Sequence, residues 1–375
     1  MIESTGRGAV VVVGAGVIGL SVAWRLAASG ARVRVVDPRP CAGASWVAGG
    51  MLAPITEAWP GEESLLDLGV AAVARWPAFA ARLREVAVDP RLRTEGTLVA
   101  AFDAADHEQL EMLADHLAAR GRAVDRLTGR ELRSLEPSLS RSVRSGLSVP
   151  GDLSVDSRKL LHALRDAAGR CGVDFVEATA TAARGGAVDL DDGSVLDGDA
   201  VVLCAGAWSR DLHDALKPLV RPVKGEILLL RARRGVITPQ RTVRASVESR
   251  PVYLVPRDGG EVVLGATQYE AGFDTEVTVA GVRDLLADAQ RLVPGLGEFA
   301  LVECGAGLRA GSRDNLPLIG WLEPGLLVAT GHHRNGVLLA PITADAVLAL
   351  LSGRSVPQPV AAADLDRFEG KGVSP

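Results

Sequence analysis

The chain has 375 residues, of which 47% are hydrophobic and 23% charged, and its formal net charge is −5. This composition is ordinary for a globular protein, and the length allows one large domain or two interleaved ones. The mild acidity and the lack of a basic run exclude a typical nucleic-acid-binding protein. No uninterrupted apolar run reaches the length of a membrane span, so we expect no membrane partner.

The cysteines and histidines do not form a metal-binding or disulfide pattern. His332 and His333 are adjacent, which does not suit joint chelation on a regular element. Sparse, isolated cysteines favour a reducing compartment, so we predict a cytoplasmic protein without a metal site. The cysteines are Cys41, Cys171, Cys204 and Cys304.

The strongest motif lies near the N-terminus, in "VVVVGAGVIGLSVAW". Val10–Val13 form a β-branched run without alternation, which is typical of a parallel strand buried on both faces. Gly14, Gly16 and Gly19 then make a G-x-G-x-x-G pattern. The first glycine permits a tight turn, the second lets a pyrophosphate approach the backbone, and the third lets helix and strand pack closely. A helix is predicted over residues 17–29.

This unit closes with a second predicted strand over residues 32–36, followed by Asp37. A carboxylate here can accept hydrogen bonds from ribose hydroxyls, and it disfavours the 2′-phosphate of NADP. Because strand, glycine turn, helix, strand and acid occur together, we predict a bound dinucleotide rather than a bare turn. The motif alone does not separate FAD from NAD.

The segment that follows, "PRPCAGASWVAGGMLAP", is rich in small residues. Ala44, Ser45, Gly49 and Gly50 leave room for a large group lying against the backbone, although a flexible surface loop is the alternative. An NAD enzyme of the simple doubly wound kind would proceed to a third strand. Here a helix is predicted over residues 63–86 instead, which favours FAD.

The middle of the chain first continues the pattern of helices and strands. A helix with Asp156 at its N-cap leads into a strand. A β-hairpin then turns at Asp192 and Gly193, and a buried strand follows over residues 201–204.

Beyond residue 220, strands follow one another without helices until a helical pattern at residues 279–293. Such a run suits an antiparallel sheet in a second domain. We therefore predict an α/β protein with a Rossmann-like dinucleotide-binding domain and a second domain on an antiparallel sheet. Lys224 is interpreted as a surface or strand-end residue without a role. The strand-like runs are residues 224–230, 252–256 and 261–267.

"GHHRNGVLLAP", residues 331–341, places two histidines and an arginine directly before an apolar run. The run is apolar on most faces, as in a buried helix. Pro341 suits a first helical turn, where a missing N–H costs little. A helix N-terminus presents unpaired N–H groups and a partial positive charge, so this one is expected to face a negative group.

Together these segments resemble the D-amino-acid oxidase and sarcosine oxidase superfamily of FAD enzymes, and within it the glycine oxidases of the thiamine pathway. The resemblance covers nearly the whole chain. Its last two motifs, in this order and spacing, are the most specific. The motifs are "VVGAGVIGLSVAWRLA", "AGGMLAP", "YLVPR", "VVLGAT", "GLRAGSRDNLPLIG" and "GHHRNGVLLAP".

The resemblance implies an FAD-binding domain made of residues 1–85, 146–220 and 305–375. Residues 86–145 and 221–304 would form an interleaved α+β substrate-binding domain, built on a mixed or antiparallel sheet that covers the flavin.

The resemblance also implies noncovalent FAD, because Cys304 precedes Arg309 rather than following it as a flavin-linking cysteine would. The segment 332–338 would pass along the flavin ring, and the helix after it would point its N-terminus at the pyrimidine side. The implied cofactor-binding residues are Gly14, Gly16, Val17, Ile18, Gly19, Asp37, Arg39, Ala44, Ser45, Gly49, Gly50, Met51, His332, His333, Arg334, Asn335, Gly336, Val337 and Leu338.

For the substrate, the resemblance implies that Arg309 binds a carboxylate and that Tyr253 donates a hydrogen bond to it. An arginine fork matches a carboxylate, although a buried ion pair for Arg309 and core packing for Tyr253 are the alternatives. Arg334 and Met51 complete the predicted substrate-binding set. Pro251 and Gln268 are expected near the substrate.

The implied activity is oxidative deamination of glycine, and of sarcosine or small D-amino acids, by hydride transfer to flavin N5. The products would be glyoxylate or another 2-oxo acid, ammonia and hydrogen peroxide, and the imine would supply the thiazole of thiamine. No catalytic acid or base is required. The partners would be the amino acid and O2, and the family tends towards homo-oligomers. Alternatives are a same-fold dehydrogenase of another amine or 2-hydroxy acid, and a non-catalytic dinucleotide-binding protein.

Overall fold

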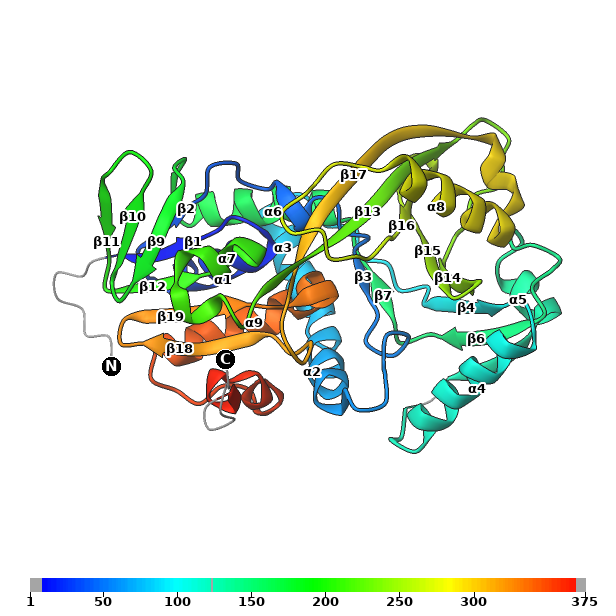
Figure 1. Cartoon of the computed structure of the whole chain (residues 1–375), viewed down its shortest axis with the longest axis horizontal. Coiled ribbons are helices and arrows are strands. Elements are labelled where there is room, and N and C mark those ends of the chain that lie inside the picture. The colour runs from blue at the N-terminus through cyan, green and yellow to red at the C-terminus, as the bar shows by residue number, and fades with distance from the viewer. Residues whose placement is uncertain (1–8, 123, 369–375) are drawn as a thin grey trace.

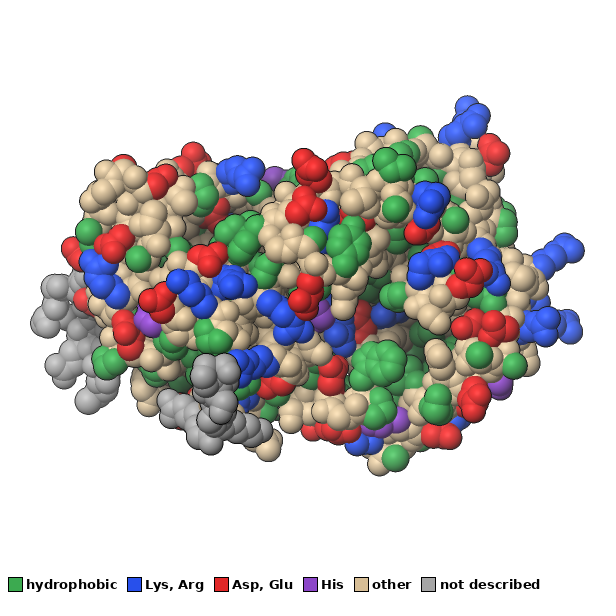
Figure 2. Space-filling model, in the orientation of Figure 1, with side chains coloured by type: hydrophobic (Ala, Val, Ile, Leu, Met, Phe, Trp, Pro, Cys, Tyr) green, Lys and Arg blue, Asp and Glu red, His purple; other side chains and the backbone are tan. Residues whose placement is uncertain are grey.

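A computed structural model describes residues 9–122 and 124–368, and two large sheets dominate it (Figure 1). The predicted FAD-binding segments also include residues 1–8 and 369–375, which lie outside the described residues. Acidic and basic side chains are interspersed over the face shown in Figure 2.

The smaller of the two large sheets carries the glycine motif beside its central strand. Its pairs are parallel, except that β18 runs antiparallel to β19. In spatial order the strands are β18 (Leu318–Glu323), β19 (Leu326–Thr330), β12 (Ala200–Leu203), β1 (Val10–Val13), β2 (Val33–Val36) and β8 (Asp174–Val176).

The faces of this sheet are covered differently. Alternate side chains of a strand point to opposite faces, so Val10 and Val12 pack among the helices while Val11 and Val13 pack towards a small sheet. This burial on both faces explains the predicted apolar run without alternation. The helices that pack together are α1 (Val17–Ala27), α6 (Ser157–Arg170) and α9 (Gly336–Leu351), and the small sheet holds β9 (Ala180–Arg184), β10 (Ala187–Leu190) and β11 (Val195–Asp197).

The larger sheet is mixed, because β14 and β4 pair in parallel while its other pairs are antiparallel. The sequence interpretation missed β14, although its valines and alanine alternate with polar residues. In spatial order the strands are β17 (Phe299–Gly311), β13 (Arg221–Ala232), β16 (Glu261–Gly265), β15 (Arg250–Pro256), β14 (Thr242–Val247), β4 (Thr97–Ala101), β6 (Ser145–Val149) and β5 (Asp125–Thr128).

The long strands β13 and β17 connect the two parts of the molecule (Figure 1). They pair from Arg221 opposite Gly311 to Ala232 opposite Phe299. A short ladder joins β3 (Met51–Leu52) to β7 (Leu153–Ser154). Four further helices are α4 (Ala104–Ala118), α5 (Gly129–Leu135), α7 (Ser209–Leu212) and α8 (Val279–Leu292).

The helix predicted over residues 63–86 is wrong as a single element. The structure has α2 (Glu63–Val73) and α3 (Trp76–Val86), bent by 42° at the break between them. Pro77 lies in the first turn of α3. Because proline has no N–H and its ring collides with the preceding turn, it kinks or breaks a helix, and here it accompanies the break.

Helix α9 is buried as predicted, but the position of Pro341 is corrected. Pro341 lies inside the helix rather than in its first turn. Pro341 therefore removes one helical hydrogen bond. Nearby, the indole of Trp76 in α3 donates to the Leu338 carbonyl, 2.9 Å away. The segment His333–Leu351 is long and apolar enough to cross a membrane, but 67% of the segment tested is buried in the fold, as in a core helix.

The predicted fold class is confirmed: the molecule is mixed α/β with a Rossmann-like sheet and a separate mixed sheet. The Asp156 cap of α6 is present, since its carboxylate accepts from the N–H groups of Arg158 and Lys159. The division into two domains stays a prediction. Strand β17 continues across its boundary between residues 304 and 305.

Changing Trp76 to Phe should destabilise the fold. The substitution leaves the Leu338 carbonyl without its indole donor and opens space in the core, which together cost about 2–4 kcal/mol. Urea unfolding measures the loss. Trp59→Phe is the matched control, because the Trp59 side chain is 66% exposed, and equal stability of the two variants would contradict the assigned role of Trp76.

Candidate active site

A cavity of about 450 Å³ lies at the carboxyl ends of the parallel strands. Residues within two positions of the ends of β1, β2, β12 and β19 line it, including Gly14, Asp37, Cys204 and His332. In open α/β sheets, ligands bind at this edge.

The glycine turn provides the space that a dinucleotide needs. Gly14 has φ +104°, and a Cβ on it would lie 2.6 Å from the Cys204 carbonyl oxygen. A Cβ on Gly19 would lie 1.8 Å from the Gly14 carbonyl oxygen, so Gly19 serves helix packing. The N-terminus of α1 opens into the cavity beside Gly16 and Ser45. The Ser45 hydroxyl accepts from the Val17 N–H at 3.1 Å, and a helix N-terminus of this kind can hold phosphate.

Asp37 organises the end of the cavity that would receive a ribose. One carboxylate oxygen accepts from the Ala15 N–H at 2.7 Å, and the other accepts from the Arg39 N–H at 2.8 Å. Asp37 and Arg39 both line the cavity. Carboxylate oxygens have further lone pairs, so these two bonds leave Asp37 able to accept from ribose hydroxyls.

His332 and His333, which also line this cavity, lie just before α9. Burial lowers the pKa of each to about 3, so both rings are neutral near pH 7. His332 Nε2 lies 3.0 Å from the Thr343 hydroxyl. His333 Nε2 is buried without a hydrogen-bond partner in the described part of the chain. His333 lines the cavity, so its unpaired nitrogen fits a polar ligand there.

A second cavity of about 180 Å³ adjoins the first. Val17, Ala44, Ser45, Arg309, His333 and Gly336 line both cavities. The smaller cavity is also lined by Met51, Tyr253, Pro251 and Gln268, the residues expected near the substrate. The two spaces therefore meet where the flavin and substrate are predicted to meet.

Arg309 lies on β17 with its guanidinium across Gly225 of β13. A Cβ on Gly225 would lie 2.2 Å from Arg309 Nη1, so the guanidinium occupies the space that a side chain would fill. Nη1 donates to the carbonyls of Lys224 at 3.4 Å and Thr267 at 3.3 Å. No carboxylate of the described residues forms an ion pair with Arg309, and burial lowers its pKa from the ordinary value. A buried guanidinium without an anion suits a ligand carboxylate.

Tyr253 projects from β15 into the same cavity. Burial raises the pKa of its hydroxyl, so the group is a neutral hydrogen-bond donor. Gly49 and Gly265 make room for the ring, because a Cβ on either would lie 3.0 Å or less from it. Tyr253 and Arg309 thus reach one cavity from two different strands.

Arg334 differs from Arg309, because acidic partners hold it. Its Nε lies 2.9 Å from a Glu57 carboxylate oxygen, and its Nη2 lies 3.3 Å from Glu62. Glu57 also pairs with Arg244 of β14 at 2.8 Å. Despite burial, which acts to raise it, the pKa of Glu57 is held below its ordinary value by Arg244 and Arg334. These charges neutralise one another, whereas Arg309 has no such partner among the described residues.

The structure brings nearly all the predicted site residues to the two cavities. Gly19 and Leu338 line neither of them. The sequence interpretation missed Glu57, Arg244 and Gly225. The alternation of β14 could have found Arg244, and a glycine within a strand indicates close approach of another group. No sequence signal marked Glu57.

Asp152 lies behind this network, in the turn between β6 and β7. Its Oδ2 accepts from the Thr56 hydroxyl at 2.8 Å, while Oδ1 is buried without a partner among the described residues. Burial raises the pKa of Asp152 from 3.8 to about 7. The charged form is therefore disfavoured in the folded protein.

Changing Asp152 to Asn should change how stability depends on pH. Because the folded-state pKa lies above the ordinary value, folding binds a proton, and this contribution is full below pH 3.8 and lost as pH rises to about 7. Wild type should lose about 1.4 kcal/mol per pH unit over that window relative to Asp152→Asn. Urea unfolding from pH 4 to 8 measures this. A constant difference between the two proteins would contradict the raised pKa.

The chain is similar to known proteins both in its sequence and in its fold. A family model described as FAD dependent oxidoreductase matches residues 9–350. The glycine oxidase of Geobacillus kaustophilus is 33% identical over 378 residues, which cover 98% of this chain and 99% of that protein. Its crystal structure matches this fold with a TM-score of 0.88, covering 98% of this chain and 100% of that one.

A second relative is longer. The bifunctional protein ThiO/ThiG of Synechocystis sp. is 34% identical over 369 residues, which cover 96% of this chain and 54% of that protein. This chain therefore spans about half the length of that relative.

Proposed function

Because this chain belongs to the family of FAD-dependent oxidoreductases, we propose that it is a glycine oxidase. It would convert glycine, water and O2 into glyoxylate, ammonia and hydrogen peroxide. In the corresponding reactions sarcosine would release methylamine in place of ammonia, and a small D-amino acid would give its 2-oxo acid. The observation that carries the proposal is the buried guanidinium of Arg309, which has carbonyl acceptors but no ion-pair partner among the described residues. The nearly full-length glycine oxidase relative supports it.

FAD fits the larger cavity on three structural grounds. Gly14 and Gly16 would admit the pyrophosphate at the N-terminus of α1, and Asp37 would accept from the ribose. The unpaired nitrogen of His333 would face the flavin end. When bound noncovalently, FAD would supply the hydride acceptor at flavin N5 and pass electrons to O2.

The residues of the smaller cavity would orient the substrate. Arg309 would bind the carboxylate through its planar fork, and Tyr253 would donate its hydroxyl hydrogen to the same group. Met51 would form an apolar wall. No acid or base is assigned, since the neutral amine needs only orientation, a dry site and suitable electrostatics.

The N-terminus of α9 would supply those electrostatics. Gly336 begins α9 and lines both cavities. The partial positive charge at the N-terminus of α9 would stabilise negative charge that develops on the bound flavin ring. Because His332 and His333 are neutral, they add no positive charge to this effect, which comes from the helix terminus and the arginines. Arg334 would hold Glu57 and the loop around it rather than the substrate carboxylate.

The proposal also covers the pathway, the cellular location and the partners of the protein. The ThiO/ThiG relative supports a role in thiamine biosynthesis, where the imine would supply the thiazole. The four cysteines are free, which supports a cytoplasmic location. The net charge of −5, with acidic and basic side chains interspersed on the face shown in Figure 2, supports a small-molecule substrate rather than nucleic acid. A homo-oligomer is expected from the family.

Two alternatives receive less support. A dehydrogenase of another amine or a 2-hydroxy acid would share this fold but would not react with O2. A non-catalytic dinucleotide-binding protein would not need the arrangement of Arg309 and Tyr253 over a second cavity.

Mixing the purified holoprotein with glycine without oxygen tests the proposal. After anaerobic mixing the absorbance of oxidised flavin should fall, and it should return when air is admitted. Hydrogen peroxide should form in proportion to the glycine consumed. Bleaching that air does not reverse would favour the dehydrogenase. A yellow protein that glycine does not bleach would reject glycine as the substrate.

Changing Arg309 to Leu should raise the KM for glycine by about 10–100-fold, because a charged hydrogen-bond partner of the carboxylate is lost. Steady-state peroxide production measures it. Arg313→Leu is the matched control, since Arg313 is exposed and donates to the Pro218 carbonyl at 3.1 Å. Equal KM values in the two variants would remove Arg309 from the site.

A further inference from the structure

A segment between β16 and α8 forms part of the wall of the smaller cavity. We call residues 266–278 the strap. Ala266 and Gln268 line the cavity, whereas the residues from Glu270 to Glu276 are mostly exposed. Phe273 of the strap packs against Trp208, which lines the larger cavity, with 5.8 Å between the ring centroids. The strap thus contacts the borders of both cavities.

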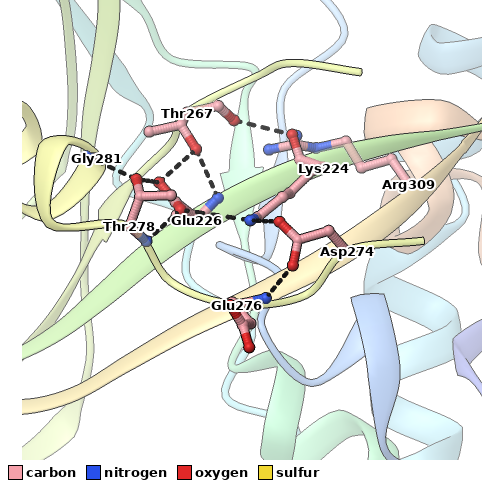
Figure 3. A network of polar contacts seen from close by, with 8 residues as sticks. All are labelled: Lys224, Glu226, Thr267, Asp274, Glu276, Thr278, Gly281 and Arg309. Carbon is pink, nitrogen blue, oxygen red and sulfur yellow. Dashed lines mark hydrogen bonds and ion pairs between the residues drawn. The ribbon is translucent and has the colours of Figure 1, made fainter. Parts of the chain in front are cut away.

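The strap begins by extending the ladder beside β13. The N–H of Lys224 donates to the Tyr269 carbonyl at 2.9 Å, and the N–H of Glu226 donates to the Thr267 hydroxyl at 2.9 Å. Neighbouring residues of a strand point to opposite faces. Gly225 therefore faces Arg309 and the cavity, while Lys224 and Glu226 point to the other face and can hold the strap from behind (Figure 3).

Lys224 is not the surface or strand-end residue predicted from the sequence. Its side chain is 0% exposed, and its ammonium pairs with Asp274 of the strap and lies 3.9 Å from Glu226. The ammonium also lies 5.5 Å from the centre of the Tyr269 ring. The hydrogen bond to Asp274 keeps the pKa of Lys224 above its ordinary value. A buried ammonium needs such a partner, because burial of an unpaired charge is strongly unfavourable.

Glu226 fixes the far end of the strap. Its carboxylate accepts from the Thr278 N–H at 2.8 Å and from the Thr267 hydroxyl at 3.2 Å. Thr278 is the N-cap of α8. A Cβ on Gly281 would lie 1.8 Å from Glu226 Oε2, so glycine there allows the carboxylate to approach the helix terminus.

The strap also contacts the substrate-binding arginine. Arg309 Nη1 donates to the carbonyls of Thr267 and Lys224, so one acceptor comes from the strap and the other from the strand that anchors it (Figure 3). We propose that Lys224 is a positioning residue for the substrate carboxylate: through Asp274 it holds the strap, and the strap holds the guanidinium of Arg309. This inference rests on the proposed carboxylate-binding role of Arg309.

Asp274→Asn tests the proposal in the holoprotein, since it removes the charge that Lys224 pairs with and keeps the shape. Hydrogen exchange should become faster in residues 266–278 and stay unchanged elsewhere. The Kd for acetate, read from the flavin spectrum, and the KM for glycine should both rise about 3–10-fold, with kcat within about twofold. Asp274→Glu should restore most of the affinity, because it restores the carboxylate.

Glu276→Gln is the matched control. It removes one negative charge from the same strap, and the network bond of Glu276 is made by its backbone N–H, which donates to Asp274 at 2.9 Å. The control should match wild type in exchange and in acetate affinity. An equal weakening in both variants would show an effect of net charge and overturn the proposal. Faster exchange in Asp274→Asn with unchanged acetate affinity would also overturn it.

Hydrogen exchange of the wild-type protein with and without acetate tests the proposal even if the Asp274 variants do not fold. If the strap and the carboxylate site are coupled, acetate must stabilise the strap as much as the strap strengthens acetate binding. Saturating acetate should therefore slow exchange in residues 266–278, and a lack of protection there would overturn the proposal. These readouts do not need glycine oxidation. Protection by acetate in a protein that does not oxidise glycine would reject the proposed function and leave this inference standing.

Discussion

The antiparallel pairing of β13 with β17 is the constraint on which the candidate site depends. It lies at one edge of the larger sheet and places Gly225 beside Arg309. A side chain at Gly225 would fill the space that the guanidinium occupies. The same pairing leaves Lys224 and Glu226 on the opposite face, where they anchor the strap. The register of this one strand pair thus positions Arg309 in the cavity and Lys224 and Glu226 on the opposite face.

Charge neutralisation divides the arginines around the smaller cavity into two kinds. Arg244 and Arg334 share Glu57, and Arg334 also contacts Glu62. Arg309 has carbonyl acceptors but no ion-pair partner among the described residues. Because a buried unpaired charge is costly, the arrangement favours an anionic ligand at Arg309. The network around Glu57 then serves to hold the loop that forms one wall of the cavity.

Much of the FAD-binding region could be predicted because its signals are local. The β-branched run, the three glycines and Asp37 are adjacent in sequence, and each has a conformational role that follows from its own chemistry. The apolar helix α9 was likewise evident from composition. The sequence pattern did not reveal the break between α2 and α3 or the interior position of Pro341, because apolar residues continue through both prolines.

The sequence by itself determined the fold class, the glycine turn, the buried C-terminal helix and many, though not all, of the residues that reach the cavities. The tertiary structure alone decided which charges pair. Arg309 and Arg334 are equally basic in the sequence, but Glu57 and Glu62, more than 270 positions from Arg334, neutralise the second and not the first. Lys224 is buried rather than a surface or strand-end residue, because the strap brings Asp274 to it. Ion pairing and burial are properties of distance in space, and a local pattern does not contain them.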